Sequence, residues 1–226
     1  MAGAEMKLFR RFASPILSNS LSSRFRNKRA HILLDKLSAL NLSEIKILDV
    51  GGSSYFWDGM KSQFKNKYKL VIVNLSKEEI GISECQKIVG DGKTLSFIKD
   101  KSFDVVVSNS VIEHLGTLNQ QREMAENIKR VGKYHFIQTP AFIFPFEPHF
   151  LFPFFHWLPK WIRVKLVQNF NLGWFMKQKS KEDAQTLVNS IRILRKKELK
   201  RFFQNSEIIS ERLCFFTKSY LVISTN

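Results

Sequence analysis

Short apolar runs that alternate with helix-compatible stretches constrain the fold of this chain most strongly. The runs lie at residues 45–50 (IKILDV), 69–75, 102–110 and 133–139, with a shorter one near Lys87–Val89. They show little polar alternation, which is typical of strands buried on both faces of a parallel sheet. The clearest helical pattern between them spans 118–131. The pattern therefore predicts an α/β fold: a Rossmann-like, doubly wound, mostly parallel sheet with helices on both faces.

The two ends of the chain add further elements to this sheet. Residues 24–40 show helical spacing of apolar residues, and 187–203 return to a helical pattern. The segments EIISERLCFF and SYLVIST then read as two closing antiparallel strands, which makes seven strands in all. We expect a basic N-terminal helical arm over 1–40, a main domain over 41–226, and an aromatic, partly helical insertion within it at 141–186.

The charge of the chain is concentrated in two flanking regions. The net charge is +16; residues 1–40 carry eight Lys/Arg against two Asp/Glu, and residues 160–203 carry twelve against three. Residues 41–159 are almost neutral. This distribution favours an anionic partner, which is a membrane surface, a phosphorylated substrate or nucleic acid, although a solvated basic face is the alternative.

Cysteine and histidine usage and the lack of a long apolar run indicate the setting. Cys85 and Cys214 are far apart, which indicates a reducing compartment without disulfides. The five histidines are scattered, so the spacing predicts no metal site. Since no apolar run reaches about 18 residues, we expect no spanning helix. We expect a cytoplasmic protein, with peripheral contact at the inner face of the membrane as an option.

The first strand ends in a turn that suits a bound ligand. Asp49 closes the strand, and Gly51, Gly52 and Ser53 follow. In doubly wound sheets, ligands lie at the carboxyl ends of the strands, and glycine lets a ligand approach the backbone closely. The turn lacks the second and third glycines of the dinucleotide fingerprint, which disfavours a hydride-transfer dehydrogenase. In the alternative interpretation no ligand is involved: Asp49 caps the turn, and the two glycines only allow an ordinary tight turn.

Polar residues also follow the next strands. Asn74 ends the second strand 25 residues after Asp49, where a ribose-reading side chain is expected. Asp91 lies in the loop VGDGKTL and can accept from an exocyclic amine. The third long strand ends in Asn109 and Ser110. Each of these is an ordinary loop residue in the alternative interpretation.

Taken in order, ILDVGG, VIVNLS, VGDGKTL, SFDVVVSNSVIEHLG and YHFIQTP resemble the class I S-adenosylmethionine-dependent methyltransferases, over about residues 44–140. The resemblance implies S-adenosylmethionine as the cofactor and a role for each matching position. The implied cofactor-binding residues, in order from the methionine end through the ribose and adenine to the sulfonium, are Asp49, Gly51, Gly52, Ser53, Asn74, Leu75, Asp91, Gly92, Asn109 and Ser110. The chain departs from the family at Asn74, where an acid is usual, and around Ser53–Tyr55, where the third glycine is missing.

Two polar pairs are candidates for the chemistry of the acceptor. Glu113 and His114 follow the third long strand in IEHLG, a pair that is similar to one found at this position in many small-molecule and lipid methyltransferases. Glu147 and His149 flank Pro148 in an apolar stretch, where a polar pair needs a reason. We predict His114, Glu147 and His149 as catalytic, with His149 favoured as general base. The alternatives are helix capping by Glu113, and a Glu147–His149 pair that only bonds nearby backbone.

The predicted function is methyl transfer, at oxygen, to a small-molecule, glycan or lipid-linked acceptor. SNSVIEH, TPAFIFPFEPHF and KKELKRFF resemble methyltransferases of bacterial surface-polysaccharide and glycolipid gene clusters. Residues 142–176 hold nine Phe and three Trp beside basic residues, which favours a membrane contact, an acceptor lid or a dimer interface. One alternative is a nucleic-acid methyltransferase: the positive charge favours it, but the absence of a Pro-Pro-aromatic motif argues against it. The other alternative is a non-catalytic scaffold.

Overall fold

The computed structural model of the chain describes residues 21–52, 56–57, 60, 63–64, 67–75 and 85–224. These residues build one seven-stranded sheet with the order β3-β2-β1-β4-β5-β9-β8. The strands are β1 (Glu44–Val50), β2 (Lys67–Asn74), β3 (Cys85–Val89), β4 (Phe103–Asn109), β5 (Gly132–Pro140), β8 (Ser206–Leu213) and β9 (Phe216–Ser224). The first five are parallel, while β9 is antiparallel to β5 and β8 is antiparallel to β9. The predicted doubly wound α/β sheet is confirmed.

The strand order reverses next to β1, and this places the site. β1 pairs with β2 on one side and with β4 on the other, so Asp49 lies opposite Ile72 and opposite Val107. In such sheets the crevice at the carboxyl ends of the strands, beside the point of reversal, is where ligands bind. The polar residues that end β1, β2 and β4 therefore meet along one edge.

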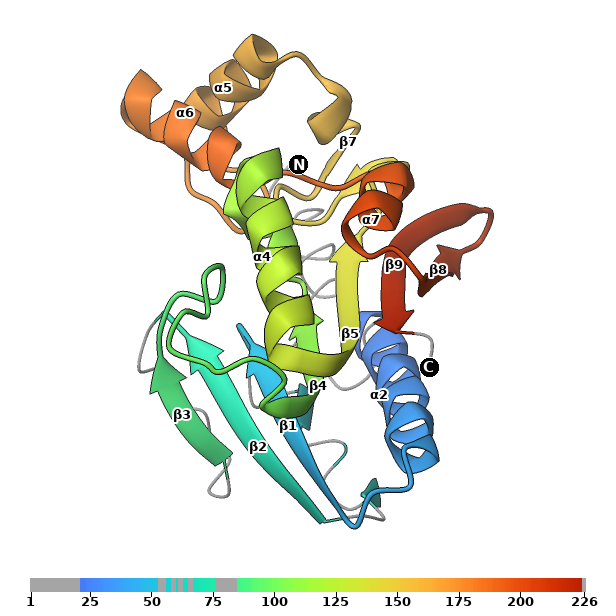
Figure 1. Cartoon of the computed structure of the whole chain (residues 1–226). Coiled ribbons are helices and arrows are strands. Elements are labelled where there is room, and N and C mark those ends of the chain that lie inside the picture. The colour runs from blue at the N-terminus through green and yellow to red at the C-terminus, as the bar shows by residue number, and fades with distance from the viewer. Residues whose placement is uncertain are drawn as a thin grey trace.

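Alternate side chains of the strands feed two cores, one on each face of the sheet. Ile47 packs with Leu33 and Leu37 of α2 (Leu21–Ala39) on one face, whereas Leu48 packs with Met124 and Ile128 of α4 (Leu118–Val131) on the other. Helix α7 (Lys196–Phe202) joins the second face. Figure 1 shows α4 and α2 on opposite sides of the strands. Because both faces are covered, the strands show little alternation in sequence.

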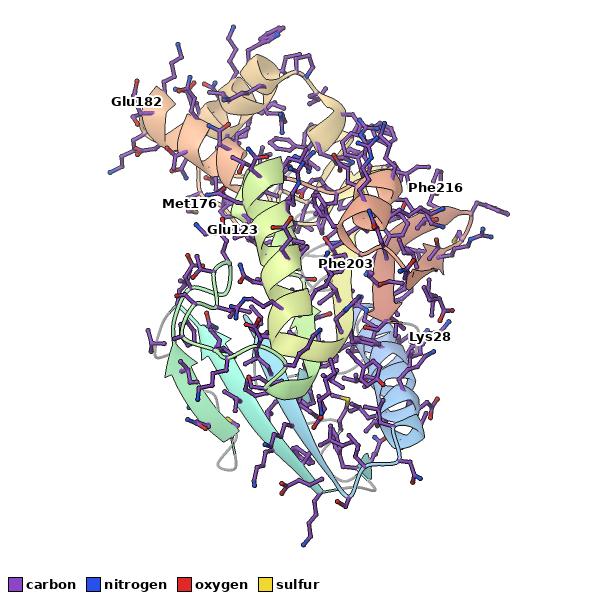
Figure 2. All side chains as sticks on the ribbon, viewed as in Figure 1. Lys28, Glu123, Met176, Glu182, Phe203 and Phe216 are labelled. Atoms are coloured by element: carbon purple, nitrogen blue, oxygen red, sulfur yellow. The ribbon has the colours of Figure 1, made fainter. Side chains whose placement is uncertain are left out.

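The insertion lies beyond the carboxyl ends of the parallel strands (Figure 1). It contains the short strands β6 (Phe146–Glu147) and β7 (Phe152–Pro153), the 3₁₀ helix η3 (Phe155–Trp157), α5 (Lys160–Asn169) and α6 (Lys181–Ser190). Together with the residues that follow it up to Ile193, the insertion has a small core of its own, formed by Phe150, Phe155, Val164, Val167, Leu172, Ala184, Val188, Ile191 and Ile193. Figure 2 shows Met176 and Glu182 at this end of the molecule, away from Lys28 on α2.

The helical pattern predicted over 187–203 is wrong in its middle. Helix α6 ends at Ser190 and α7 begins at Lys196, and between them the chain is extended. Leu194 is fully buried there and forms a parallel bridge with Ala141, the residue after β5. Pairing with the end of the sheet thus replaces the helical turn that the local sequence favours.

Within the described ranges, none of the helices has both the length and the apolar composition that a bilayer crossing requires.

Candidate active site

Backbone hydrogen bonds tie the loops after the strands to their neighbours at the carboxyl edge. The N–H of Gly51 donates to the carbonyl of Val73 at 2.7 Å, and that of Gly90 donates to Asn74 at 3.0 Å. The N–H of Ser110 donates to the carbonyl of Gln138 at 3.0 Å. The loops that carry the predicted cofactor-binding residues therefore start from one continuous, hydrogen-bonded edge.

Asp49 is buried at the end of β1 and has one carboxylate oxygen paired. Its Oδ2 accepts a hydrogen bond from Nε1 of Trp57 at 2.5 Å. Its Oδ1 is buried and has no hydrogen-bond partner among the described residues. Burial raises the pKa of Asp49 to about 7, against the opposing effect of the Trp57 bond. No sequence motif pointed to Trp57.

The glycines after Asp49 are required by close contacts within the protein. Gly51 has a φ of +73°, and a Cβ there would lie 2.6 Å from Cγ2 of Val111. A Cβ at Gly52 would lie 1.9 Å from Oδ2 of Asp49. The absence of side chains therefore keeps the loop close to the Asp49 carboxylate. Ser53 lies outside the described residues.

The residues after β2 and β3 leave polar and apolar groups available at the edge. Oδ1 of Asn74 accepts from the N–H of Leu75 at 2.8 Å, and the amide Nδ2 has no hydrogen-bond partner in the described part of the chain. Leu75 exposes 75% of its surface. Oδ1 of Asp91 accepts from the N–H of Lys93 at 2.8 Å, and Oδ2 lies 3.8 Å from its Nζ. A Cβ at Gly92 would lie 2.5 Å from Val50, so this loop packs against β1.

This set of groups fits S-adenosylmethionine. The unpaired Asp49 oxygen suits an ammonium group, the amide of Asn74 suits a ribose hydroxyl, and the half-exposed Asp91 carboxylate suits an exocyclic amine. The exposed side chain of Leu75 offers an apolar surface for a ring. The individual roles of these residues remain predictions.

Asn109 and Ser110, at the end of β4, have their side chains engaged by the protein. Oδ1 of Asn109 accepts from Nη1 of Arg29 at 2.9 Å, and the Ser110 hydroxyl donates to Oε1 of Gln138 at 2.7 Å. Ser110 also has a φ of +58°. The edge beside the expected sulfonium is thus held by α2 and β5, which the sequence did not indicate.

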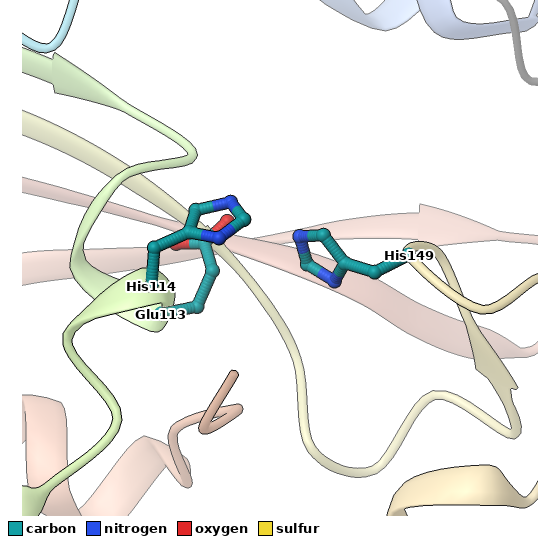
Figure 3. A group of neighbouring side chains, drawn as sticks. All are labelled: Glu113, His114 and His149. Carbon is teal, nitrogen blue, oxygen red and sulfur yellow. The ribbon is translucent and has the colours of Figure 1, made fainter. Parts of the chain in front are cut away.

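Both candidate polar pairs meet at this edge and form one group, the Glu–His cluster: Glu113, His114, Glu147 and His149. The first two lie on the 3₁₀ helix η2 (Ile112–Leu115) after β4, and the others lie at and after β6. The rings of His114 and His149 are 4.7 Å apart between centroids and nearly perpendicular. Figure 3 shows the ring of His149 pointing toward His114 and Glu113.

Glu113 is fully buried and held from two sides. Its Oε2 accepts from the Thr139 hydroxyl at 3.0 Å, and its backbone carbonyl accepts from the N–H of Arg192 at 2.7 Å. Its Oε1 is buried without a partner among the described residues. Burial raises the pKa of Glu113, and the nearby charge of His149 only partly offsets this. Thr139 and Arg192 are supporting residues that no motif revealed.

Glu147 orients His149. Its Oε2 accepts from the backbone N–H of His149 at 2.8 Å and of Phe150 at 2.6 Å, and its Oε1 lies 2.7 Å from Nδ1 of His149. Burial acts to lower the pKa of His149, but the Glu147 and Glu113 carboxylates outweigh it and raise this pKa. The predicted local bond between Glu147 and nearby backbone therefore exists alongside a bond to the imidazole.

His114 is exposed to solvent on one side, and on the other its ring meets the ring of His149 edge-on. This partial burial, and then the charge of His149, lower the pKa of His114 to about 4, so its imidazole is neutral near pH 7. The cluster thus combines His149, whose pKa is raised, with His114, whose pKa is lowered.

The family described as "Methyltransferase domain" matches residues 48–135, the segment from β1 into β5. This segment of the chain is therefore similar to a methyltransferase domain. Two uncharacterized proteins of Mycobacterium tuberculosis are 39% identical to it over 64 residues, or 28% of this chain. The chain matches about a fifth of their length, 22%.

Solved structures share the fold of this chain. The match to a protein of Pyrococcus horikoshii covers 97% of this chain and 97% of that protein, with a TM-score of 0.57 and 16% identity. The magnesium protoporphyrin IX methyltransferase of Synechocystis, solved with bound SAH, has a TM-score of 0.55 and 8% identity, with 99% of this chain and 95% of its own covered. At these identities the likeness shows the fold. The predicted fold is confirmed, and the family match over residues 48–135 supports the predicted enzyme class, a methyltransferase.

Proposed function

We propose that this methyltransferase transfers the methyl group of S-adenosylmethionine to a hydroxyl oxygen of a glycan or lipid-linked acceptor. The observation that carries the proposal is the Glu–His cluster at the carboxyl edge. A histidine whose Nδ1 is fixed by the Glu147 carboxylate stands there beside the strand-end loops that suit the cofactor. Such a pair is the arrangement that general-base removal of a hydroxyl proton needs.

S-adenosylmethionine is the cofactor of this domain, and it supplies a methyl group already activated on a sulfonium. The protein must therefore chiefly align the acceptor with that group. In the proposed site Asp49 holds the ammonium end, Asn74 the ribose and Asp91 the adenine amine. Asn109 and Ser110 line the edge beside the sulfonium, and Arg29 and Gln138 fix their positions.

The proton of the acceptor hydroxyl passes to His149 in this proposal. Because Nδ1 is bonded to Glu147, the ring nitrogen that faces Glu113 and His114 is Nε2 (Figure 3). A neutral His149 with its proton on Nδ1 has a free lone pair on Nε2. The Glu147 carboxylate then stabilises the imidazolium that forms, while neutral His114 borders the same space.

Exposed aromatic residues of the insertion support an acceptor presented at a lipid surface. The exposed aromatic side chains of the described insertion are Phe154, Trp157, Trp161, Phe170 and Trp174, and the apolar Ile143 and Met176 are exposed as well. Nζ of Lys165 lies 5.5 Å from the Trp161 ring, so a cation and an aromatic ring share this surface. Tryptophan beside lysine is typical of segments that lie at the headgroup boundary of a membrane. We propose peripheral contact with anionic lipid at this surface.

The first test is calorimetric titration of the purified chain with S-adenosylhomocysteine. We expect micromolar affinity, a loss of at least about tenfold in Asp91→Ala, and no change in the matched control Asp100→Ala, whose carboxylate pairs with Arg130 at the surface. Absence of binding by the unmodified chain would overturn the proposal. Binding would justify assays of methyl transfer to glycan and lipid-linked acceptors.

A further inference from the structure

The Glu–His cluster contains a donor set that proton transfer alone does not explain. One atom from each of Glu113, His114 and His149 lies within 4.8 Å of the others. Two of these residues come from η2 and the third from the insertion, so the fold assembles a set that sequence spacing does not contain. The Oε1 atom of Glu113 is buried without a partner among the described residues, which costs free energy unless something else satisfies it.

We infer that Glu113, His114 and His149 bind one divalent transition-metal ion, with Zn²⁺ as the best-suited species. Two imidazole nitrogens and one carboxylate oxygen are typical ligands of Zn²⁺ and its neighbours in the first transition row, whereas Mg²⁺ and Ca²⁺ prefer oxygen alone. Three protein ligands leave a fourth position open. Figure 3 shows the two rings and the carboxylate converging on one space.

The geometry permits this ion after small side-chain movements. Ligands about 2.0–2.1 Å from a tetrahedral Zn²⁺ lie about 3.4 Å from one another, so donor atoms that are within 4.8 Å must approach by at most about 1.4 Å. His114 retains an exposed edge, which gives an ion a path from solvent. His149 lies on the loop after β6, outside the seven-stranded sheet.

Neighbouring residues already orient two of the three ligands. Glu147 engages Nδ1 of His149 at 2.7 Å and so directs Nε2 toward the cluster. The Thr139 hydroxyl engages one oxygen of Glu113 at 3.0 Å and leaves the other free. In zinc sites, the ring nitrogen of a histidine ligand that does not bind the metal usually bonds to a carboxylate or carbonyl oxygen. The bond between Glu147 and Nδ1 of His149 matches this feature, and it is a separate observation from the presence of three ligands.

A bound ion would affect methyl transfer, and this part of the inference rests on the proposed function. The ion takes the Nε2 lone pair of His149, which proton transfer from the acceptor also uses. Ion binding and general-base action therefore exclude each other. We expect Zn²⁺ to lower the rate of methyl transfer as the site fills.

Binding is tested on the full chain, freed of any histidine tag and stripped with a chelator. Titration with Co²⁺, followed by its visible absorption, should reach one ion per chain, and elemental analysis after dialysis against Zn²⁺ should give the same ratio. His114→Ala and His149→Ala should each weaken binding by at least about tenfold. His31→Ala removes an exposed histidine of α2 and should change nothing.

Two outcomes would overturn the inference. One is the absence of a Co²⁺ spectrum and of stoichiometric Zn²⁺ in a chain whose circular dichroism shows it folded. The other is metal binding that both His114→Ala and His149→Ala retain. Titration of the metal-free chain with S-adenosylhomocysteine separates the two proposals: cofactor binding without metal binding contradicts only the metal site, and the reverse contradicts only the proposed function.

Discussion

If Asp49 holds the cofactor as proposed, its buried carboxyl group should make cofactor binding depend on pH. With its pKa near 7, Asp49 is mostly neutral at pH 6 and mostly ionised at pH 8, and the ionised form attracts an ammonium group. We therefore expect the affinity for S-adenosylhomocysteine to rise by up to about tenfold from pH 6 to pH 8. Calorimetry at several pH values measures this rise. Asp49→Asn should bind more weakly with little pH dependence; an equal rise in that variant would contradict the assignment.

In the proposed mechanism, the Glu147–His149 pair should make methyl transfer depend on pH in a second way. The base must be neutral, and the carboxylates raise the pKa of His149 above 6.5, so the rate should increase with pH through a range above 6.5. Glu147→Gln removes one of these charges and should move the rise to lower pH while it reduces kcat about 10²-fold or more. The profile of kcat against pH measures both effects. Glu182→Gln, on the exposed face of α6, should leave the profile unchanged.

At the scale of single residues, the sequence indicated the candidate site residues that lie at the ends of successive strands. Asp49, Asn74, Asp91 and Asn109 each end a strand or open the next loop, so their common edge follows from the topology. Their partners could not be predicted. Trp57, Arg29 and Thr139 contact the site through hydrogen bonds whose donors and acceptors depend on how the elements pack, and no local pattern encodes that.

Among the elements, α2 is joined to the closing hairpin by a buried ion pair. Nε of Arg29 lies 3.0 Å from both oxygens of Glu211 on β8, and the Ser219 hydroxyl donates to the same carboxylate. Arg29→Met would leave that carboxylate buried without its cation and should lower the free energy of unfolding by about 3–5 kcal/mol. Lys36→Met breaks the exposed pair with Glu207 on the same helix and strand, and should cost less than about 1 kcal/mol.

Chemical denaturation of both variants measures these differences. Equal effects of the buried and the exposed substitution would show that the Arg29 pair contributes no more than a surface contact. Because Arg29 also holds Asn109, we expect Arg29→Met to weaken S-adenosylhomocysteine binding as well, which Lys36→Met should not do.

Elements with strong local signals were predicted closely, and those set by long-range pairing were not. The bounds of α4 match the predicted 118–131 because Thr117 caps its first turn and the apolar residues keep helical spacing. The break between α6 and α7 was missed because Leu194 leaves the helix to pair beside β5. Local spacing does not contain that competing contact.

The whole molecule joins a sheet domain to an aromatic insertion, in which residues 160–186 carry six Lys/Arg and two Asp/Glu. The sheet holds the predicted cofactor edge, and the insertion contributes Glu147 and His149 to the same site. The insertion also carries most of the exposed aromatic side chains of the described chain. One segment thus supplies both the proposed base and the surface that would meet a lipid-linked acceptor, so membrane contact and methyl transfer are expected to depend on it together.

This arrangement predicts binding to anionic vesicles through the insertion. Co-sedimentation should show binding to vesicles that contain an anionic lipid, little binding to neutral ones, and weaker binding at high salt, because the chain carries +16 and salt screens exposed charges. Trp161 exposes 63% of its surface, and Trp161→Ala should reduce binding several-fold. Phe215, in the β8–β9 hairpin, exposes 97% of its surface, and Phe215→Ala should leave vesicle binding unchanged. Equal losses in both variants would mean that general hydrophobicity, and not the insertion, drives the association.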